Sequence, residues 1–299
     1  MKKDLCKPVF TDNQKNSNFI FTGTCRAGSG VVAAVTGYLA QKKCYICSLQ
    51  QFDDESTDKF FMRAVFRPHS NAVDMSGIKS GFGEVARDFE MDWNIHDPDI
   101  PVRTIIMVSK YDHCLGDILY RLRKNEFNME IYAVISNHAD LGPMVEREGI
   151  RFVHLPVTPE TKAQQEEHLL ELLCESKVEL IVLARYMQIL SKHLSRQLLG
   201  KCINIHHSFL PGFKGASPYQ QAFARGVKVI GATAHYVTPD LDEGPIIEQV
   251  VTRVDHSYTP ERLARVGRDN ECIALARAIT YHTERRVFLD GNKTVIFGG

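Results

Sequence analysis

Two polar residues near the end of a predicted strand have side chains that could act together on a carbonyl group. Asn204 and His206 are two positions apart in the run KCINIHHSFLPGF, so on a strand both side chains emerge on the same face. Ile203 and Ile205 would then point to the opposite face. An amide can donate a hydrogen bond to an oxyanion, and an imidazole can move a proton near neutral pH. The pair therefore predicts a site for acyl chemistry.

A carboxylate that could tune His206 lies in the later run DLDEGP, at Asp242. This run is expected to be a loop between two strands that returns to the same end of the sheet. A carboxylate beside an imidazole raises the pKa of the imidazole, and it can also position or deprotonate a water molecule. His235 shares a strand face with Thr233 just before this loop and could hold the carboxylate in place. Spacing alone leaves a structural role open, because strand-end histidines are often satisfied structural residues and acidic loops are usually solvated.

The first third of the chain predicts a small ferredoxin-like domain. We expect its strands at residues 19–24, 45–52, 59–66 and 92–95, and its helices at residues 31–42 and 82–90. This β-α-β-β-α-β order is typical of an antiparallel sheet with helices on one face. The segment HDPDIPV then carries two prolines and two aspartates, which favours a linker.

Beyond the linker, strands and helices alternate. We expect strands at residues 103–109, 130–136, 151–154, 179–184 and 202–206, separated by helical segments. This alternation predicts right-handed crossovers and a mostly parallel, Rossmann-like sheet, so the chain is of the α/β class. Two longer strands are expected at residues 228–237 and 245–254, followed by a helix at 260–285 and a hairpin that turns at Asp290-Gly291.

These elements divide the chain into four parts. Residues 1–17 are polar and unpatterned and are interpreted as a leader, residues 18–96 as the first domain, residues 97–102 as the linker and residues 103–299 as the catalytic domain. In a parallel sheet, ligands bind beyond the carboxyl ends of the strands, where Asn204 and His206 would lie. Pro211 and Gly212 should end the strand and force a loop around them.

Composition excludes several functional classes. Lys and Arg total 36 and Asp and Glu total 36, so no global field attracts nucleic acid or an anionic membrane. The N-terminus lacks an apolar signal core, and no apolar run is long enough for a membrane span, which predicts a cytoplasmic protein. The C-x-x-C pair Cys44 and Cys47 lacks a second pair, and His206 and His207 should point to opposite faces, so no metal site is expected. Dinucleotide, P-loop and serine-hydrolase motifs are also missing.

The run from Asn204 to Ile247, NIHHSFLPGFKGASPYQQAFARGVKVIGATAHYVTPDLDEGPII, closely resembles the formyltransferase-fold family that binds 10-formyltetrahydrofolate. Its pattern is Asn-x-His followed by a distal Asp. The N-terminal part resembles an ACT domain, and from Phe19 onward the chain is similar to the formyltetrahydrofolate deformylase family. The resemblance implies hydrolysis of 10-formyltetrahydrofolate to formate and tetrahydrofolate, which supplies formate for purine synthesis and balances one-carbon pools. It implies no cofactor, since the folate is the substrate.

The resemblance also implies roles for individual residues. Asn204 would polarise the formyl carbonyl, His206 would stabilise or protonate the tetrahedral intermediate, and Asp242 would orient His206 and activate water. The segment LARYMQIL resembles the one whose backbone groups hold the pterin ring, and the loop before Asp242 would close the pocket. These folate-binding residues are Met187, Gln188, Ile189, Leu190, Val237, Thr238, Asp240 and Leu241.

Two segments depart from the family patterns. Glycinamide ribonucleotide formyltransferases carry a Gly- and Asn-rich phosphate loop after the first strand, which here reads SKYDHCLGD (109–117) and makes water the favoured acceptor. The D-R-P-G turn of amino-acid-binding ACT domains reads Ala27-Gly28-Ser29-Gly30, which keeps only Gly30 as a candidate ligand residue. The alternatives are a phosphoribosylglycinamide-type formyltransferase and a non-catalytic amino-acid sensor. Because ACT-like sheets often pair, a homo-oligomer, with a tetramer as one form, is expected with these domains in the interface.

Overall fold

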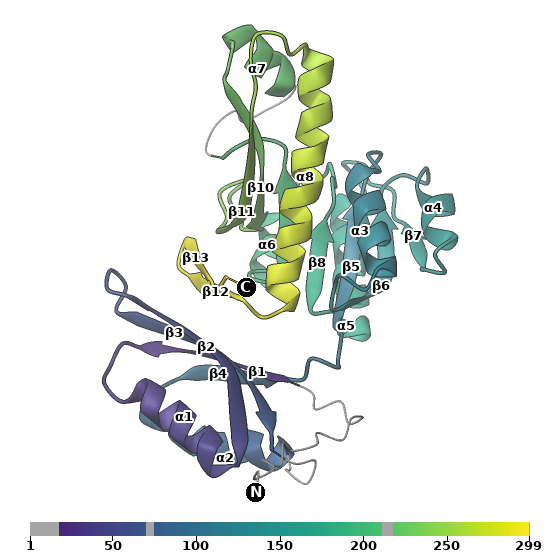
Figure 1. Ribbon diagram of the computed structural model, residues 1–299. Coiled ribbons are helices and arrows are strands. Elements are labelled where there is room, and N and C mark those ends of the chain that lie inside the picture. The colour runs from purple at the N-terminus through teal and green to yellow at the C-terminus, as the bar shows by residue number, and fades with distance from the viewer. Residues whose placement is uncertain (1–17, 70–74, 211–217, 299) are drawn as a thin grey trace, which may run out of the picture. The chain divides into compact units, whose positions relative to one another are not determined.

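The computed structural model describes residues 18–69, 75–210 and 218–298. The chain divides into two compact units, Met1–Asp99 and Ile100–Gly299 (Figure 1). The expected leader, residues 1–17, lies outside the described residues, as do Pro211 and Gly212.

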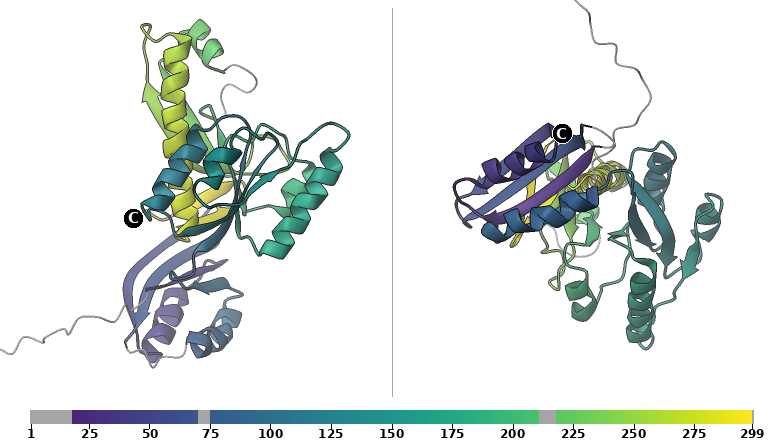
Figure 2. Two further views of the ribbon diagram at one scale, coloured as in Figure 1. Left: turned by 90° about the vertical axis from the view of Figure 1, so that its right-hand side faces the viewer. Right: turned by 90° about the horizontal axis from the view of Figure 1, so that it is seen from below.

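The first unit is a four-stranded antiparallel sheet with both helices on one face (Figures 1 and 2). Its strand order is β2-β3-β1-β4, with β1 pairing antiparallel to both β3 and β4. The predicted β-α-β-β-α-β order is confirmed. The elements are β1 (Phe19–Arg26), α1 (Val31–Gln41), β2 (Cys44–Asp54), β3 (Lys59–Pro68), α2 (Met75–Asp88) and β4 (Asp92–His96).

The core of this unit is aromatic. The Phe82 ring packs edge-on against Phe21, with ring centroids 5.0 Å apart, and against Tyr38 at 5.4 Å. Edge-to-face packing of this kind adds to the burial energy. One detail of the sequence interpretation was wrong. Helix α2 begins at Met75 rather than near residue 82.

The second unit contains a seven-stranded sheet of order β11-β10-β9-β8-β5-β6-β7. The pairs from β9 to β7 are parallel, whereas β10 runs antiparallel to both β9 and β11. The predicted mostly parallel α/β sheet is therefore confirmed. The strands are β5 (Val102–Val108), β6 (Met129–Ser136), β7 (Phe152–His154), β8 (Leu180–Leu183), β9 (Cys202–His206), β10 (Val229–Tyr236) and β11 (Ile246–Arg253).

Helices cover both faces of this sheet (Figure 2). Because side chains alternate along a strand, Ile106 packs in the cluster that includes Leu115 of α3 and Leu275 of α8. Its neighbour Ile105 packs in the opposite cluster with Leu169 of α5. The helices are α3 (His113–Arg123), α4 (Gly142–Glu146), α5 (Lys162–Ser176), α6 (Lys192–Gln197), α7 (Pro218–Arg225) and α8 (Pro260–Thr283).

A short hairpin of β12 (Val287–Asp290) and β13 (Lys293–Ile296) follows α8. Among the helices in the described residues, none has the length and apolar composition that crossing a membrane requires.

Candidate active site

The candidate site forms where β9 ends beside β10. The two strands pair so that His235 lies opposite Asn204 and Thr233 lies opposite His206. Ile203 and Ile205 pack into the cluster that includes α8 residues, so Asn204 and His206 occupy the other face. The shared face expected from their spacing agrees with this arrangement.

The structure brings His206 and Asp242 together although they are far apart in the chain. His206 Nδ1 lies 3.3 Å from Asp242 Oδ2. In a neutral imidazole with its proton on Nδ1, the other ring nitrogen carries a lone pair. That atom, Nε2, is buried and has no hydrogen-bond partner among the described residues. A buried polar atom without a partner is uncommon, and it indicates a position that faces a ligand or water.

Asp242 is held as an anion. Burial by itself raises the pKa of Asp242, but the hydrogen bond from His206 acts against burial, and the pKa lies well below the usual range of an aspartate. Its backbone has a φ of 56°, a left-handed conformation that costs free energy for most side chains. Strain of this kind tends to persist at functional sites, where the surroundings fix it.

Asn204 is oriented by His235. The Asn204 Nδ2 atom lies 3.2 Å from His235 Nε2, and His235 Nδ1 lies 2.8 Å from the carbonyl oxygen of Tyr236. A carbonyl oxygen only accepts, so Nδ1 carries a proton and the neutral ring accepts at Nε2 from the amide. An amide nitrogen has two hydrogens, so one remains available for a substrate oxygen. Asp242 Oδ1 is 3.7 Å from the same Nε2 atom, which places all four side chains around one space.

Thr233 does not hold the carboxylate. Its hydroxyl is fully buried and donates to Ser208 O at 3.0 Å, while it accepts from Leu210 N and Gln249 Nε2, both at 3.1 Å. These bonds use all the hydrogen-bonding capacity of the hydroxyl. Thr233 therefore holds the backbone that follows β9.

The loop that carries Asp242 closes against β10 through Gly244. A Cβ atom at Gly244 would lie 1.7 Å from the carbonyl oxygen of Tyr236, and the Tyr236 N–H donates to Pro245 O at 2.9 Å. Only glycine allows this approach. The glycine thus fixes the point from which the loop returns and the position of Asp242.

Gly244→Ala is expected to lower the free energy of unfolding by about 1–3 kcal/mol, the cost of overpacking, because the backbone of Tyr236 must move. Denaturant unfolding of the full chain checks this. Gly28→Ala is the matched control, since a Cβ there meets no atom within 4 Å. Equal unfolding free energies for the two variants would contradict the close approach.

The predicted folate-binding segment follows β8. Met187 is 52% exposed and Ile189 is 60% exposed, and Leu241 on the Asp242 loop is 56% exposed. Large apolar side chains this open to water at the carboxyl end of a sheet favour a surface that an apolar ligand covers. The segment is anchored, because Met187 N donates to Ser109 Oγ at 2.9 Å. On the other side, Val237 is buried and Thr238 Oγ1 donates to Asp240 O at 2.9 Å.

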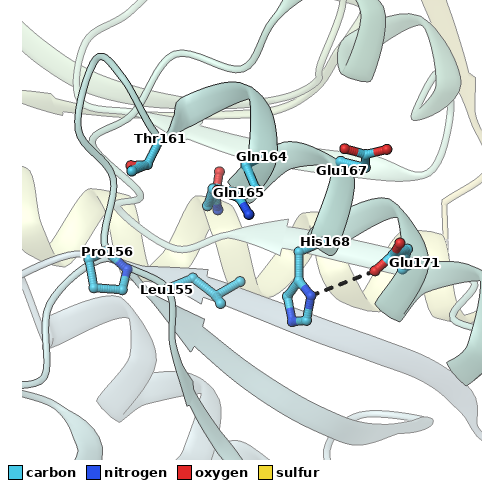
Figure 3. A pocket seen from close by; sticks show the side chains of 8 residues that line it. All are labelled: Leu155, Pro156, Thr161, Gln164, Gln165, Glu167, His168 and Glu171. Carbon is cyan, nitrogen blue, oxygen red and sulfur yellow. Dashed lines mark ion pairs between the residues drawn. The ribbon is translucent and has the colours of Figure 1, made fainter.

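Gln188 and Leu190 of this segment are half-buried. A separate hollow of about 420 Å³ lies beside α5, lined by residues between Leu155 and Glu171 (Figure 3). It contains none of the residues predicted for the site. Gln165 lies at its border and donates to Tyr186 at 3.4 Å, which ties α5 to the segment that follows β8.

The sequence interpretation missed a buried cluster beside the site. His206 and His207 were expected on opposite faces, but their rings stack with centroids 4.9 Å apart, because the chain leaves the strand after His206. Arg185 Nη1 lies 2.7 Å from His207 Nδ1, and Arg185 Nε lies 3.3 Å from Glu271 Oε2. Tandem histidines were the one signal in the sequence, whereas nothing local connects them to residue 271.

Ligand-type atoms of His113, Cys114 and Glu271 lie within 4.8 Å of one another. By residue type this group could hold a metal ion, which the spacing analysis overlooked because α3 and α8 are distant in the chain. The same Glu271 oxygen, however, pairs with His113 at 2.8 Å and with the guanidinium of Arg185. The positive charge of the Arg185 guanidinium beside the Glu271 carboxylate disfavours the binding of a metal cation there.

Lys110 and His113, both in the segment that departs from the transferase pattern, differ in their surroundings. Lys110 is exposed, whereas His113 belongs to the Glu271 cluster. In the first unit, Gly30 precedes α1 with a φ of 89°, the left-handed conformation that favours glycine.

Comparisons with known proteins show the family of the chain. The formyl transferase family matches residues 102–279. A formyltetrahydrofolate deformylase of Corynebacterium sp. (strain P-1) is 50% identical over 277 residues, covering 93% of this chain and 97% of the relative. The chain belongs to the formyltetrahydrofolate deformylase family. The family assignment made from the run Asn204 to Ile247 is confirmed.

Solved structures separate this family from its neighbours. A formyltetrahydrofolate deformylase from Burkholderia mallei has a TM-score of 0.91 and 52% identity, covering 94% of this chain and 100% of its own. Glycinamide ribonucleotide transformylase 1 from Symbiobacterium toebii has a TM-score of 0.63 and 30% identity, covering 69% of this chain. The deformylase match therefore includes both units, whereas the transformylase match leaves about a third of the chain uncovered.

Proposed function

We propose that the chain hydrolyses 10-formyltetrahydrofolate to formate and tetrahydrofolate, and so supplies formate for purine synthesis. The observation that carries the proposal is the buried Nε2 atom of His206, which has no partner among the described residues and belongs to a ring that contacts Asp242. Asn204 adds a free amide hydrogen in the same space. Membership of the deformylase family supports the substrate and the reaction.

In the proposed mechanism, water attacks the formyl carbon while Asn204 donates to the developing oxyanion. Asp242 orients His206 and accepts a hydrogen bond from the water. The low pKa of Asp242 makes it a weak base, so the proton of the water passes to His206 Nε2. As the carbon–N10 bond breaks, Nε2 returns that proton to N10, which leaves tetrahydrofolate and formic acid. The formic acid loses its remaining acidic proton to solvent and is released as formate.

We propose that the pterin ring lies on the apolar surface formed by Met187, Ile189 and Leu241, with Val237 and Thr238 on the opposite side. The exposure of the first three residues supports this position. The chemistry assigned to Asn204, His206 and Asp242 needs only water as a co-reactant, so we propose that the reaction uses no cofactor.

Formate release by the purified full-length protein, with 10-formyltetrahydrofolate and no amine acceptor, tests the function. Release of formate and tetrahydrofolate in equal amounts is the expected result. Turnover that requires glycinamide ribonucleotide would instead make the chain a formyl transferase. Binding of amino acids without turnover of any formyl folate would favour the sensor alternative.

We also propose that the chain forms a homo-oligomer in the cytoplasm through its first unit. Strand β2 is at the edge of the four-stranded sheet, and its Tyr45, Leu49 and Phe52 side chains are exposed. An exposed edge strand with apolar side chains favours pairing with another chain. Light scattering of the purified protein checks the assembly, and a monomer at micromolar concentration would contradict it.

A further inference from the structure

The catalytic imidazole proposed above has two kinds of contact. Asp242 touches one edge of the His206 ring, at Nδ1. The ring of His207 covers one face, with planes 24° from parallel. A contact at one nitrogen leaves the ring free to turn about its side-chain torsions, whereas a stacked neighbour fixes its plane. His207 can do this only if its own ring is fixed.

Arg185 fixes the ring of His207. Its Nη1 atom lies 2.7 Å from His207 Nδ1. A guanidinium stays protonated and only donates, so Nδ1 of His207 must carry a lone pair, and the ring is neutral with its proton on Nε2. In agreement, burial and the charges of Arg185 and His206 lower the pKa of His207 to about 4.

Arg185 is fixed in turn. Its backbone has a φ of 66°, its guanidinium lies 5.1 Å from the ring centroid of Tyr111, and its Nε atom faces Glu271 at 3.3 Å. The side chain is only 11% exposed. The Nε–Oε2 contact is an ion pair without hydrogen-bond geometry. A buried arginine without a carboxylate would be costly, so the charge of Glu271 stabilises this one.

Two further helices contact the Glu271 carboxylate. His113 of α3 lies 2.8 Å from Oε2, and the hydroxyl of Tyr219 on α7 donates to Oε1 at 3.0 Å. Burial alone raises the pKa of Glu271, but the hydrogen bond from His113 and the charge of Arg185 outweigh it and lower the pKa. One helical turn earlier, a Cβ atom at Gly267 would lie 1.9 Å from the Tyr219 hydroxyl, so this glycine lets Tyr219 reach the carboxylate.

We propose that Glu271, Arg185 and His207 form a positioning chain that fixes the plane of His206, so that Nε2 faces the formyl carbon. The inference rests on the proposed function and adds three residues that do not touch the reacting atoms. It assigns a purpose to a buried ion pair that reaches the His206 ring through His207. A bent or rotated imidazole would lose alignment with the carbonyl, and misplacement of about 1 Å can cost about 10²-fold in rate.

The first experiment needs no activity. The histidine ring nitrogens of the full-length protein are followed by ¹⁵N NMR between pH 5.5 and 8, with His207 assigned by its loss in His207→Phe. The charged and titratable groups that face the two stacked rings are Asp242, His235, Arg185, Glu271, His113 and Tyr219. We expect His207 to stay neutral with its proton on Nε2. A proton on Nδ1, or titration at an ordinary histidine pKa, would overturn the proposal.

The second experiment measures kinetics. Glu271→Gln keeps the size of the side chain but removes the charge that anchors Arg185. We expect kcat to fall about 10- to 100-fold with less than about a twofold change in KM, because no substrate contact is removed. Asp269→Asn, an exposed carboxylate on the same helix, is the matched control and should keep the wild-type kcat. An unchanged kcat in folded Glu271→Gln would overturn the positioning role.

Thermal unfolding reports whether Glu271→Gln folds. If it does not, His207→Phe decides the question, since phenylalanine keeps a flat ring against His206 but has no ring nitrogen that Arg185 can hold. We expect the kcat of His207→Phe to fall about 10- to 100-fold. An unchanged kcat in folded His207→Phe would contradict the proposal. A wild-type protein that releases no formate refutes the proposed function instead, and the NMR result remains independent of it.

Discussion

Asp242→Asn is expected to lower kcat by about 10²- to 10⁴-fold, the range for losing a group that acts in proton transfer. Asparagine has nearly the same shape and tolerates the left-handed backbone of this position, where φ is 56°. The substitution therefore removes the charge that lies 3.3 Å from His206 Nδ1 and leaves the loop in place. Formate release at saturating 10-formyltetrahydrofolate measures the effect.

The control for Asp242→Asn is Glu243→Gln, which removes the next negative charge of the same loop. Glu243 is exposed, and the field of an exposed charge is screened by salt and solvent. We expect this variant to keep its activity. A kcat for Asp242→Asn within about twofold of the wild type would remove Asp242 from the mechanism.

His206→Ala should cause a loss of the same size, about 10²- to 10⁴-fold in kcat. The substitution deletes the buried Nε2 atom that carries the proton between water and N10 in the proposed mechanism. It also leaves Asp242 without the contact that helps to lower its pKa. Single-turnover formate release separates this loss of chemistry from slow product release. His256→Ala, at an exposed histidine, is the control.

Combining His206→Ala with Asp242→Asn distinguishes a shared mechanism from two separate contributions. Residues that act as a unit lose little more together than the more damaging single change removes. We therefore expect the double variant to be within about tenfold of the slower single variant. A rate equal to the product of the two losses would indicate that the imidazole and the carboxylate act independently.

The sequence predicted the sheet and the residues that meet at its carboxyl end. Successive side chains of a strand point to opposite faces of the sheet. The packing of Ile105 and Ile106 in two different clusters therefore follows from their neighbouring positions in the strand. The predicted proximity of His235 to Asp242 needed only the direction in which the next strand returns. These features depend on neighbours in the chain or on paired strands.

The Glu271 cluster could not be predicted in the same way. Arg185, Tyr219 and Glu271 come from a loop and two helices, and nothing in their spacing indicates that they meet. The stacking of His207 depends on where β9 ends, and strand ends are the least predictable feature of a pattern. Likewise, the glycines at positions 77, 81 and 83 weaken the helical pattern of α2 and hid its start at Met75.

The antiparallel pairing of β10 with β9 has a consequence for refolding. Asp242 comes after β10 in the chain, so it reaches His206 only when β10 has joined a sheet whose other members are parallel. Recovered enzymatic turnover is therefore a direct probe of the moment when β10 pairs with β9.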